Sequence, residues 1–205
     1  MIKVQILDYG IGNIKSLFSA LSYLNFKPIV DNKLKKNIDL LILPGVGSFG
    51  NAMNLLKCQN LIDEIKNYSL KGSKLLGICL GMQILFNNSE ESEHIDGLKL
   101  INGNVKKLPI LSERTKLPNI NWSELRINQE HSFFNSDENF KGSHYYFLHS
   151  YYCSCEDNLN ISAYSKFNNF DFCAIVNKEN IFGLQFHPEK SRKQGLELLK
   201  KIIFY

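Results

Sequence analysis

The sequence predicts an α/β protein with a mostly parallel sheet flanked by helices and with extra strands in its second half. Up to about residue 86, short apolar segments alternate with amphipathic helical ones, an order typical of a doubly wound parallel sheet. Residues 38–43 are almost wholly apolar, as expected of a parallel strand that helices cover on both faces. From residue 97, strand-like segments alternate with Asn, Gly and Ser turns, which predicts the extra strands.

Four strands and three helices are predicted in the first half. The strands are expected at residues 2–7, 27–31, 38–43 and 74–78. Asn13 is expected to cap the first helix, because an Asn side chain accepts hydrogen bonds from first-turn N–H groups. Spacing at i, i+3, i+4 and i+7 predicts that its inward face carries Ile14, Leu17, Phe18, Leu21 and Leu24. Two further helical segments are predicted, one ending near Asn67 with Leu61, Ile62 and Ile65 inward, and one at residues 80–86.

The second half is predicted to add strands and to close with a helix. The strands are expected at residues 97–108, 144–152, 161–165, 172–176 and 181–186. The helix is expected at residues 194–203, with Leu196, Leu199 and Ile203 on one face. The acidic residues 89–93 are interpreted as a solvated loop. Because no repeat or linker divides the chain, we expect one domain over residues 1–205.

Composition excludes several classes of protein. Hydrophobic residues make up 44% and charged residues 21% of the 205 residues, as in ordinary globular proteins. A formal net charge of +4 is too small to predict a nucleic-acid groove. There is no apolar run of about 18 residues to span a membrane, and residues 1–5 do not resemble a signal peptide. We therefore expect a cytoplasmic protein that binds neither nucleic acid nor membranes.

The cysteines do not predict a disulfide framework or a metal centre. Their number is odd and their spacing irregular, at Cys58, Cys79, Cys153, Cys155 and Cys173. The segment 153–155 has two cysteines on alternate residues, but a zinc site needs about four ligands and no second Cys or His pair is present. We expect no metal and no cofactor.

Residues 45–50, Gly-Val-Gly-Ser-Phe-Gly, match the G-x-G-x-x-G pattern of dinucleotide-binding loops. The context disfavours that interpretation, because the motif follows the third predicted strand and Pro44 opens the turn. Asp63 and Glu64, which stand about where a ribose-binding acid would, fall in a helical stretch. The alternative is a loop of small residues whose N–H groups face an oxyanion. An ordinary tight turn stays open as well.

The segment Gly77-Ile78-Cys79-Leu80-Gly81 has the pattern of a nucleophile elbow. In an elbow, a sharp strand-to-helix turn exposes the central side chain, and flanking glycines relieve crowding. A cysteine there lies over a helix N-terminus, which favours the thiolate, and the N–H of Leu80 points to where an oxyanion would form. The alternative interpretation is that Cys79 is a small buried hydrophobic residue.

His187 is the predicted base for this nucleophile. It ends an apolar strand, and Pro188 and Glu189 follow it, so that a rigid turn can present imidazole and carboxylate to one another. His149 is a rival base without a nearby acid in the sequence. The other histidines lie among polar loop residues and are interpreted as surface groups, namely His94, His131 and His144.

Segments along the chain together resemble a known enzyme family. Residues 77–83 with His187-Pro188-Glu189 resemble the class I (triad) glutamine amidotransferases, which implies a flavodoxin-like fold. Residues 8–13, 44–50, 146–151 and 187–191 narrow the resemblance to the glutaminase subunits of imidazole glycerol phosphate synthase, an enzyme of histidine biosynthesis.

The resemblance implies a chemistry and a set of roles. Cys79 would attack the side-chain amide of glutamine, and His187, oriented by Glu189, would transfer the proton to departing ammonia. The oxyanion would be held by the loop Gly45-Val46-Gly47 and by the N–H of Leu80. The amino-acid end of glutamine would be held by Gln83, Ser150 and Tyr151.

The resemblance also implies a partner. Members of this family dock on a (β/α)8-barrel synthase or cyclase subunit and pass ammonia through it, forming a heterodimer. The positions that match the family's interface are Asn13, Trp122, Tyr146 and Lys190. For Tyr146 and Lys190, a core aromatic and a solvated charge remain the alternative interpretations.

One segment departs from the family pattern. Where the family has Pro-His-Met/Ile-Gly-Trp-Asn, residues 118–123 are Pro-Asn-Ile-Asn-Trp-Ser, so that Asn119 and Asn121 replace a His and a Gly. An alternative function is therefore a paralogous subunit that supplies ammonia for amidination of an acetamido sugar in surface-polysaccharide biosynthesis. A cysteine hydrolase that needs no partner, and a binding subunit with a relict site, also stay open.

Overall fold

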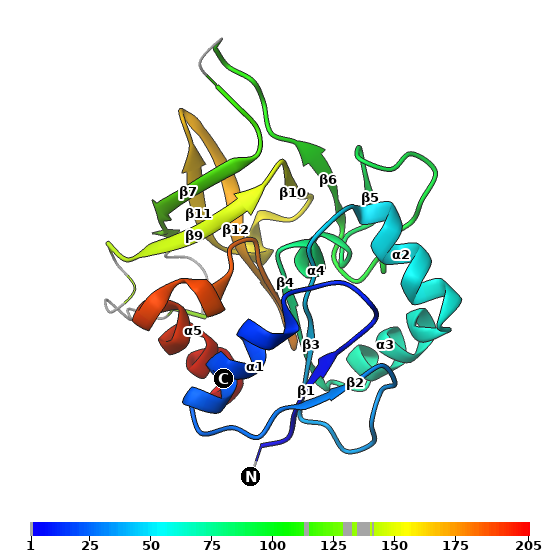
Figure 1. Ribbon diagram of the computed structural model, residues 1–205. Helices are drawn as coiled ribbons and strands as arrows, with labels where there is room; N and C mark the ends of the chain where they lie inside the picture. The colour runs from blue at the N-terminus through cyan, green and yellow to red at the C-terminus, as the bar shows by residue number, and fades with distance from the viewer. Residues whose placement is uncertain (1, 113–114, 129–132, 135–139, 141) are drawn as a thin grey trace.

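An eight-stranded sheet forms the centre of the computed structural model, which describes residues 2–112, 115–128, 133–134, 140 and 142–205 (Figure 1). Its strands, in spatial order, are β2 (Ile29–Asp31), β1 (Val4–Leu7), β3 (Leu40–Leu43), β4 (Lys74–Ile78), β13 (Ile181–Leu184), β12 (Phe170–Lys178), β11 (Ile161–Phe167) and β8 (Arg126–Ile127). The strands from β2 to β13 pair in parallel, and the remaining pairs are antiparallel. The predicted mostly parallel sheet is confirmed.

Two smaller sheets lie beside the C-terminal ends of the parallel strands (Figure 1). One contains β10 (Tyr151–Cys155), β6 (Gly103–Lys107) and β5 (Asn88–Ser89), and the other pairs β7 (Asn119–Glu124) with β9 (His144–His149). The sequence patterns did not predict β5, β7 or β8. They also predicted one strand over residues 144–152, whereas β9 and β10 are separate and belong to different sheets.

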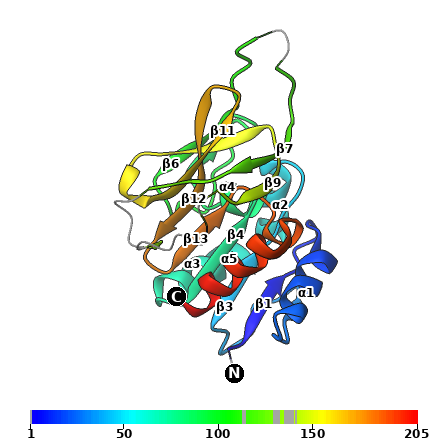
Figure 2. The same ribbon diagram turned by 90° about the vertical axis from the view of Figure 1, so that its left-hand side faces the viewer.

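Helices cover both faces of the central sheet (Figure 2). They are α1 (Ile14–Tyr23), α2 (Phe49–Cys58), α3 (Leu61–Leu70), α4 (Leu80–Gln83) and α5 (Arg192–Phe204), with 3-10 turns η2 (Asn158–Asn160) and η3 (Pro188–Lys190). Successive residues of a strand point to opposite faces. Ile42 accordingly packs into the core that α1 and α5 share, while Leu41 and Leu43 pack into the core of α2 and α3. This two-sided burial explains why residues 38–43 are so apolar.

Several predicted helix details need correction. The helical stretch expected to end near Asn67 is two helices, because Asn60 adopts a left-handed conformation with φ 57° between α2 and α3, which asparagine tolerates. Phe18 is not on the inward face of α1: its side chain is 41% exposed, and Ala20 is buried instead. The helix expected at residues 80–86 ends at Gln83. Asn13 does cap α1, accepting a hydrogen bond from the Ser16 amide at 3.4 Å.

The sequence predicted a solvated loop for the acidic segment 89–93. In the structure this segment is bonded to α2. The Glu91 carboxylate accepts a 2.7 Å hydrogen bond from the Phe49 amide, and the Ser92 hydroxyl accepts one of 3.0 Å from Gly50. Both amides lie at the N-terminus of α2, where N–H groups have no partner within the helix and the helix dipole favours negative charge. The segment therefore caps α2 and is held in place by it.

Backbone-to-backbone packing joins β3, β4 and α4 at the turn that carries Cys79. A Cβ atom on Gly81 would lie 1.8 Å from the Leu43 carbonyl oxygen, and one on Gly77 would lie 2.3 Å from the Gly81 carbonyl oxygen. Both distances are far shorter than the contacts that non-bonded atoms make in proteins. Glycine is required at both positions because no side chain fits between these segments.

We therefore expect Gly81→Ala to lower the free energy of unfolding by about 3 kcal/mol, since the added methyl must push β3 and α4 apart. Equilibrium unfolding in urea measures the effect. Ser19→Ala, at an exposed position of α1, is the control and should leave stability within about 0.5 kcal/mol of the original chain. A Gly81→Ala chain as stable as this control would contradict the packing described above.

Candidate active site

Cys79 lies in the turn between β4 and α4 in an unusual backbone conformation. Its φ of 55° and ψ of −108° lie outside the regions that residues with a side chain normally occupy. The conformation is held from both sides: the Cys79 amide donates a 2.7 Å hydrogen bond to the Leu184 carbonyl, and its own carbonyl accepts one of 3.0 Å from Met82. Strain of this kind persists only where the surroundings enforce it, and it is frequent at active sites.

The Cys79 side chain reaches a pocket of about 230 Å³ at the ends of the parallel strands. The residues that line it are Val46, Gly47, Cys79, Leu80, Gln83, Glu91, Pro118, Leu148, His149, Ser150 and Tyr151. Six residues predicted to bind the oxyanion or the substrate thus lie around one cavity with the cysteine.

Gly45 is the exception, because the structure places it outside this pocket. A Cβ atom there would lie 2.9 Å from the Leu80 Cβ and 3.1 Å from the Tyr9 hydroxyl. Gly45 instead lines a narrow cavity of about 10 Å³ together with Asn13, His187 and Glu189. Gly45 packs against the turn that carries Cys79, and its assignment to the oxyanion site stays a prediction.

The G-x-G-x-x-G segment does not offer a dinucleotide site. A dinucleotide places its pyrophosphate on the N-terminus of the helix that follows the glycines. Here that position, at the start of α2, is occupied by Glu91 and Ser92, which accept hydrogen bonds from Phe49 and Gly50. A carboxylate already occupies the anion-binding end of the helix.

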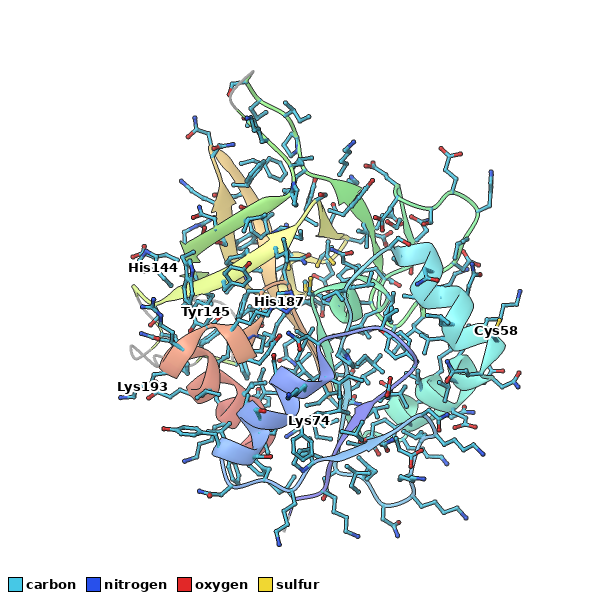
Figure 3. All side chains as sticks on the ribbon, viewed as in Figure 1. Cys58, Lys74, His144, Tyr145, His187 and Lys193 are labelled. Atoms are coloured by element: carbon cyan, nitrogen blue, oxygen red, sulfur yellow. The ribbon has the colours of Figure 1, made fainter. Side chains whose placement is uncertain are left out.

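His187 and Glu189 form a buried pair at the start of η3. The His187 Nδ1 lies 2.9 Å from a Glu189 carboxylate oxygen, and both side chains are 3% exposed. The backbone N–H of His187 donates to the Tyr146 carbonyl at 2.9 Å, which holds this residue beside β9 (Figure 3). Nδ1–H donates to the carboxylate, so the other nitrogen, Nε2, is the one available for proton transfer.

The charges around His187 favour its protonated form. Burial alone lowers the pKa of the imidazole, but its interactions with Cys79 and Glu189 outweigh burial and raise it to about 10. Nε2 has no partner at hydrogen-bond geometry among the described residues, so the sulfur acts on the ring from close by without a well-formed bond. An imidazolium beside a cysteine favours the thiolate form of its sulfur.

His149 is not available as a base, although it lines the pocket. Its Nδ1–H donates to the Tyr151 carbonyl at 2.8 Å, and its Nε2 accepts a hydrogen bond of 3.1 Å from the side-chain NH2 group of Asn119. Burial lowers the pKa of His149 to about 4. The ring is therefore neutral at pH 7, and both of its nitrogens are occupied.

Glu91 is a pocket residue that the sequence patterns missed. It lines the cavity beside Gln83 and Tyr151, and the nearby Glu91 charge contributes to the raised pKa of the Tyr151 hydroxyl, after burial. Its position depends on the docking of residues 89–93 onto α2, and no local pattern predicts that contact.

Three of the predicted interface residues form one aromatic and basic patch. The rings of Trp122 and Tyr146 lie 5.8 Å apart. Lys190 lies over the Tyr146 ring at 5.7 Å, and Arg192, which had not been predicted, lies over the Trp122 ring at 4.9 Å. The fourth predicted residue, Asn13, is near the same end of the molecule, on the narrow cavity beside His187.

Among the residues that the structure describes, the remaining predicted groups show no second catalytic arrangement. His94 and His144 are exposed, as expected, while His131 lies outside the described residues. All five cysteines are free thiols. In the described part of the chain, no cluster of His, Cys, Asp or Glu could hold a metal ion, and no helix is long and apolar enough to cross a membrane.

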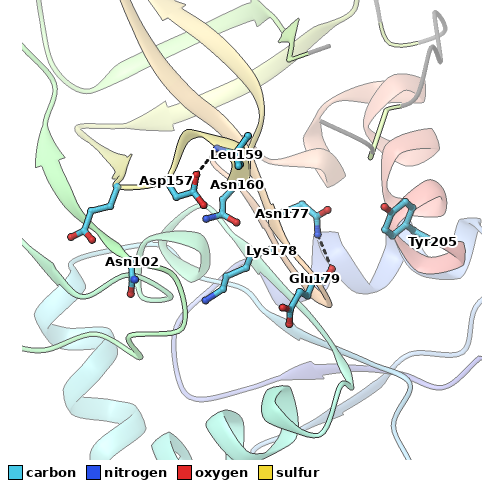
Figure 4. A pocket seen from close by; sticks show the side chains of 9 residues that line it. Asn102, Asp157, Leu159, Asn160, Asn177, Lys178, Glu179 and Tyr205 are labelled. Atoms are coloured by element: carbon cyan, nitrogen blue, oxygen red, sulfur yellow. Dashed lines mark hydrogen bonds between the residues drawn. The ribbon is translucent and has the colours of Figure 1, made fainter. Parts of the chain in front are cut away.

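A larger pocket of about 570 Å³ lies away from Cys79, between η2 and the β12–β13 turn (Figure 4). Its polar groups are engaged in local structure. Lys178 donates to the Leu100 carbonyl at 3.2 Å, Asp157 accepts from the Leu159 amide at 2.9 Å, and Asn177 donates to the Glu179 carbonyl at 2.9 Å. It contains no cysteine or histidine, so it offers no counterpart to the cysteine–histidine arrangement.

Comparison with known proteins supports the same interpretation as the geometry of the site. The sequence model of the family "Glutamine amidotransferase class-I" matches residues 5–204. The chain belongs to this family. It is 40% identical over 199 residues to imidazole glycerol phosphate synthase subunit HisH of Caldanaerobacter subterraneus subsp. tengcongensis, covering 96% of this chain and 95% of that one. It is 40% identical over 205 residues to the same subunit of Prochlorococcus marinus subsp. pastoris, covering 99% and 98%. Within the amidotransferases, the chain belongs with the HisH subunits.

Solved structures show the amidotransferase fold at lower sequence similarity. A crystal structure of glutamine amidotransferase matches with a TM-score of 0.75 and 17% identity, covering 98% of this chain and 99% of that one. The structure of PurLQS from Thermotoga maritima matches with a TM-score of 0.76 and 20% identity, covering 100% and 98%. The predicted fold class is confirmed.

The electrostatic description predicts two separate histidine titrations, which NMR can measure. We expect the His187 ring to stay protonated until pH rises to about 10, and His149 to stay neutral until pH falls to about 4. Alkylation of Cys79 removes the negative charge of the sulfur, so the pKa of His187 should then fall. A His187 titration near 6.5 that alkylation does not change would contradict the pairing.

Proposed function

We propose that this chain is the glutaminase subunit of an imidazole glycerol phosphate synthase. It hydrolyses glutamine to glutamate and ammonia and delivers the ammonia to a cyclase subunit. The observation that carries the proposal is the buried His187–Glu189 pair, which interacts with Cys79, the cysteine that lines the pocket. Membership of the HisH subunits supports the choice of glutamine as substrate.

Acylation begins when Cys79 attacks glutamine. The sulfur attacks as the thiolate of its pair with protonated His187 and forms a bond to the side-chain amide carbon. The negative charge that develops on the amide oxygen is held by N–H groups of the Val46–Gly47 loop and of Leu80. Leu80 is the first residue of α4, so its N–H has no partner within the helix and is free to stabilise an oxyanion.

His187 then returns its proton to the amide nitrogen, the C–N bond breaks, and ammonia leaves. The product on the enzyme is a γ-glutamyl thioester of Cys79. Water attacks the thioester carbon while His187 accepts a proton from that water. The carbon–sulfur bond breaks, glutamate departs, and the sulfur leaves as the thiolate beside protonated His187. Glu189 holds the ring in the tautomer that this cycle requires and stabilises the imidazolium.

The pocket lining suits the two charged groups at the other end of glutamine. Glu91 supplies a carboxylate to the pocket lining, and we assign it to binding the ammonium group of the substrate. Gln83, Ser150 and Tyr151 supply polar groups for the carboxylate end. One oxygen of Glu91 is held by the Phe49 amide, so the side chain is ordered before substrate binds, which reduces the entropy lost on binding.

Ammonia must be protected from water, because at neutral pH it becomes ammonium and loses its nucleophilicity. We assign the patch of Trp122, Tyr146, Lys190 and Arg192, together with Asn13, to contact with a (β/α)8-barrel cyclase that receives the ammonia. Trp122 is 38% exposed and the neighbouring Ile120 is 60% exposed. Exposed aromatic and Arg side chains grouped in this way are typical of the centres of protein interfaces.

The differences at residues 119 and 121 do not favour the sugar-amidination alternative. Asn119 is buried and bonds to His149 inside the molecule, so this substitution does not alter the exposed surface that would meet a partner. Asn121 is exposed on β7. Relatives at 40% identity carry the imidazole glycerol phosphate synthase name, which supports the histidine pathway.

Cys79→Ala in complex with the cyclase tests the catalytic assignment. We expect glutamine-dependent turnover to fall by at least about 10³-fold, because the thioester forms on the Cys79 sulfur. Turnover with added ammonium salt should be unchanged, since the cyclase site is intact. Steady-state assays with the two nitrogen sources measure both quantities. Retained glutamine-dependent activity would contradict the proposal, and so would loss of both activities in a variant that still binds its partner.

Trp122→Ala tests the partner surface. We expect the dissociation constant for the cyclase to rise about thirtyfold, the effect of losing a central aromatic contact worth about 2 kcal/mol. Isothermal titration calorimetry gives the constant. Leu159→Ala removes a side chain that is 69% exposed in η2 and is the matched control, with affinity unchanged. Equal affinities for the two variants would place the interface elsewhere.

A further inference from the structure

Gln185 is a buried polar residue to which the mechanism above gives no role. It directly follows β13, and its side chain is fully buried. Its backbone N–H donates to the Ala174 carbonyl at 2.9 Å. Burying a side-chain amide is unfavourable unless both its oxygen and its NH2 group find partners. The partners it has are therefore informative.

A chain of hydrogen bonds runs from the substrate pocket through Gln185 to the nucleophile. Gln83 Nε2 donates to the Tyr151 carbonyl at 3.0 Å and to Gln185 Oε1 at 3.2 Å. Gln185 Nε2 in turn donates to Cys79 Sγ at 3.9 Å, within the longer range of hydrogen bonds to sulfur. Three side chains and one backbone carbonyl form the chain.

The direction of every bond follows from its first member. The Tyr151 carbonyl can only accept, so Gln83 must turn its NH2 group toward it. That same NH2 group faces Gln185, which must therefore present its oxygen. The amide of Gln185 is planar, and its remaining NH2 group consequently points at the sulfur of Cys79. No other orientation of the two amides satisfies all three contacts.

The Cys79 sulfur has a second neighbour with the opposite preference. The Leu148 carbonyl lies 3.6 Å from Sγ and accepts a hydrogen bond from the thiol. A carbonyl oxygen favours the protonated sulfur, whereas an N–H donor favours the deprotonated sulfur. In a buried site, where water does not compensate, such a contact has a large effect on the balance between the two forms.

We infer that Gln185 is a catalytic residue whose side-chain N–H stabilises the thiolate of Cys79, and that Gln83 fixes this N–H in place from the glutamine pocket. The inference rests on the proposed role of Cys79 as nucleophile. It adds a donor to the reacting sulfur that is separate from the His187–Glu189 pair. Gln83 then has two functions, since it also lines the pocket.

The rate of alkylation of Cys79 by iodoacetamide, measured against pH in the full chain, tests this inference. Peptide mass spectrometry reads Cys79 separately from the other cysteines, and exposed Cys58 on α2 is an internal reference (Figure 3). In Gln185→Leu, the inflection of the Cys79 profile should move up by about one pH unit, which is about tenfold slower alkylation below the inflection. Gln185→Glu keeps the shape of the side chain and places a carboxylate at the sulfur, so its shift should be at least as large.

Gln5→Leu is the matched control. Gln5 is also a fully buried glutamine, and its side chain bonds to the Lys33 carbonyl and the Lys35 amide on the edge of the sheet. It should leave the Cys79 profile unchanged. An unchanged profile in a folded Gln185→Glu chain overturns the inference. If Cys79 of the original chain is not alkylated at all, the proposed function fails instead.

Discussion

The conformation of Cys79 is the constraint on which the rest of the site depends. Its backbone, with φ 55° and ψ −108°, turns the chain through a sharp angle from β4 into α4 and directs the sulfur into the pocket. The neighbouring strands hold this strained turn: Leu184 accepts the Cys79 amide, and Gly77 and Gly81 let three backbone segments approach closely. Without that approach the turn would relax, and neither the sulfur nor the first N–H of α4 would face the substrate.

Chemically similar groups around this turn have different roles because their surroundings differ. Two histidines lie near the sulfur, but His149 is held neutral by burial and by hydrogen bonds at both nitrogens, whereas His187 pairs with Glu189 and favours its protonated form. Proton transfer is thereby directed to a single nitrogen, Nε2 of His187. The same principle applies to the carboxylates, since Glu189 orients a base while Glu91 caps a helix and faces the pocket.

Features encoded by short patterns were predictable, and features that need distant contacts were not. The apolar residues 38–43 and the glycines around Cys79 indicated the parallel sheet and the turn, because local sterics and burial determine both. Strand β7 was missed because its alternating Asn and Ser residues have low strand propensity, and only pairing with β9 makes it a strand. Glu91 was misjudged for a related reason: its position follows from the packing of segments far apart in the sequence.

The reaction passes through one covalent intermediate on Cys79, and detecting it is the most direct test. The complex with the cyclase is mixed with glutamine, quenched in acid during turnover, digested and analysed by mass spectrometry. A γ-glutamyl group on the peptide that contains Cys79, absent when glutamate replaces glutamine, is the predicted result. Full glutamine-dependent turnover with no adduct on Cys79, or with the γ-glutamyl group on another residue, would contradict the account.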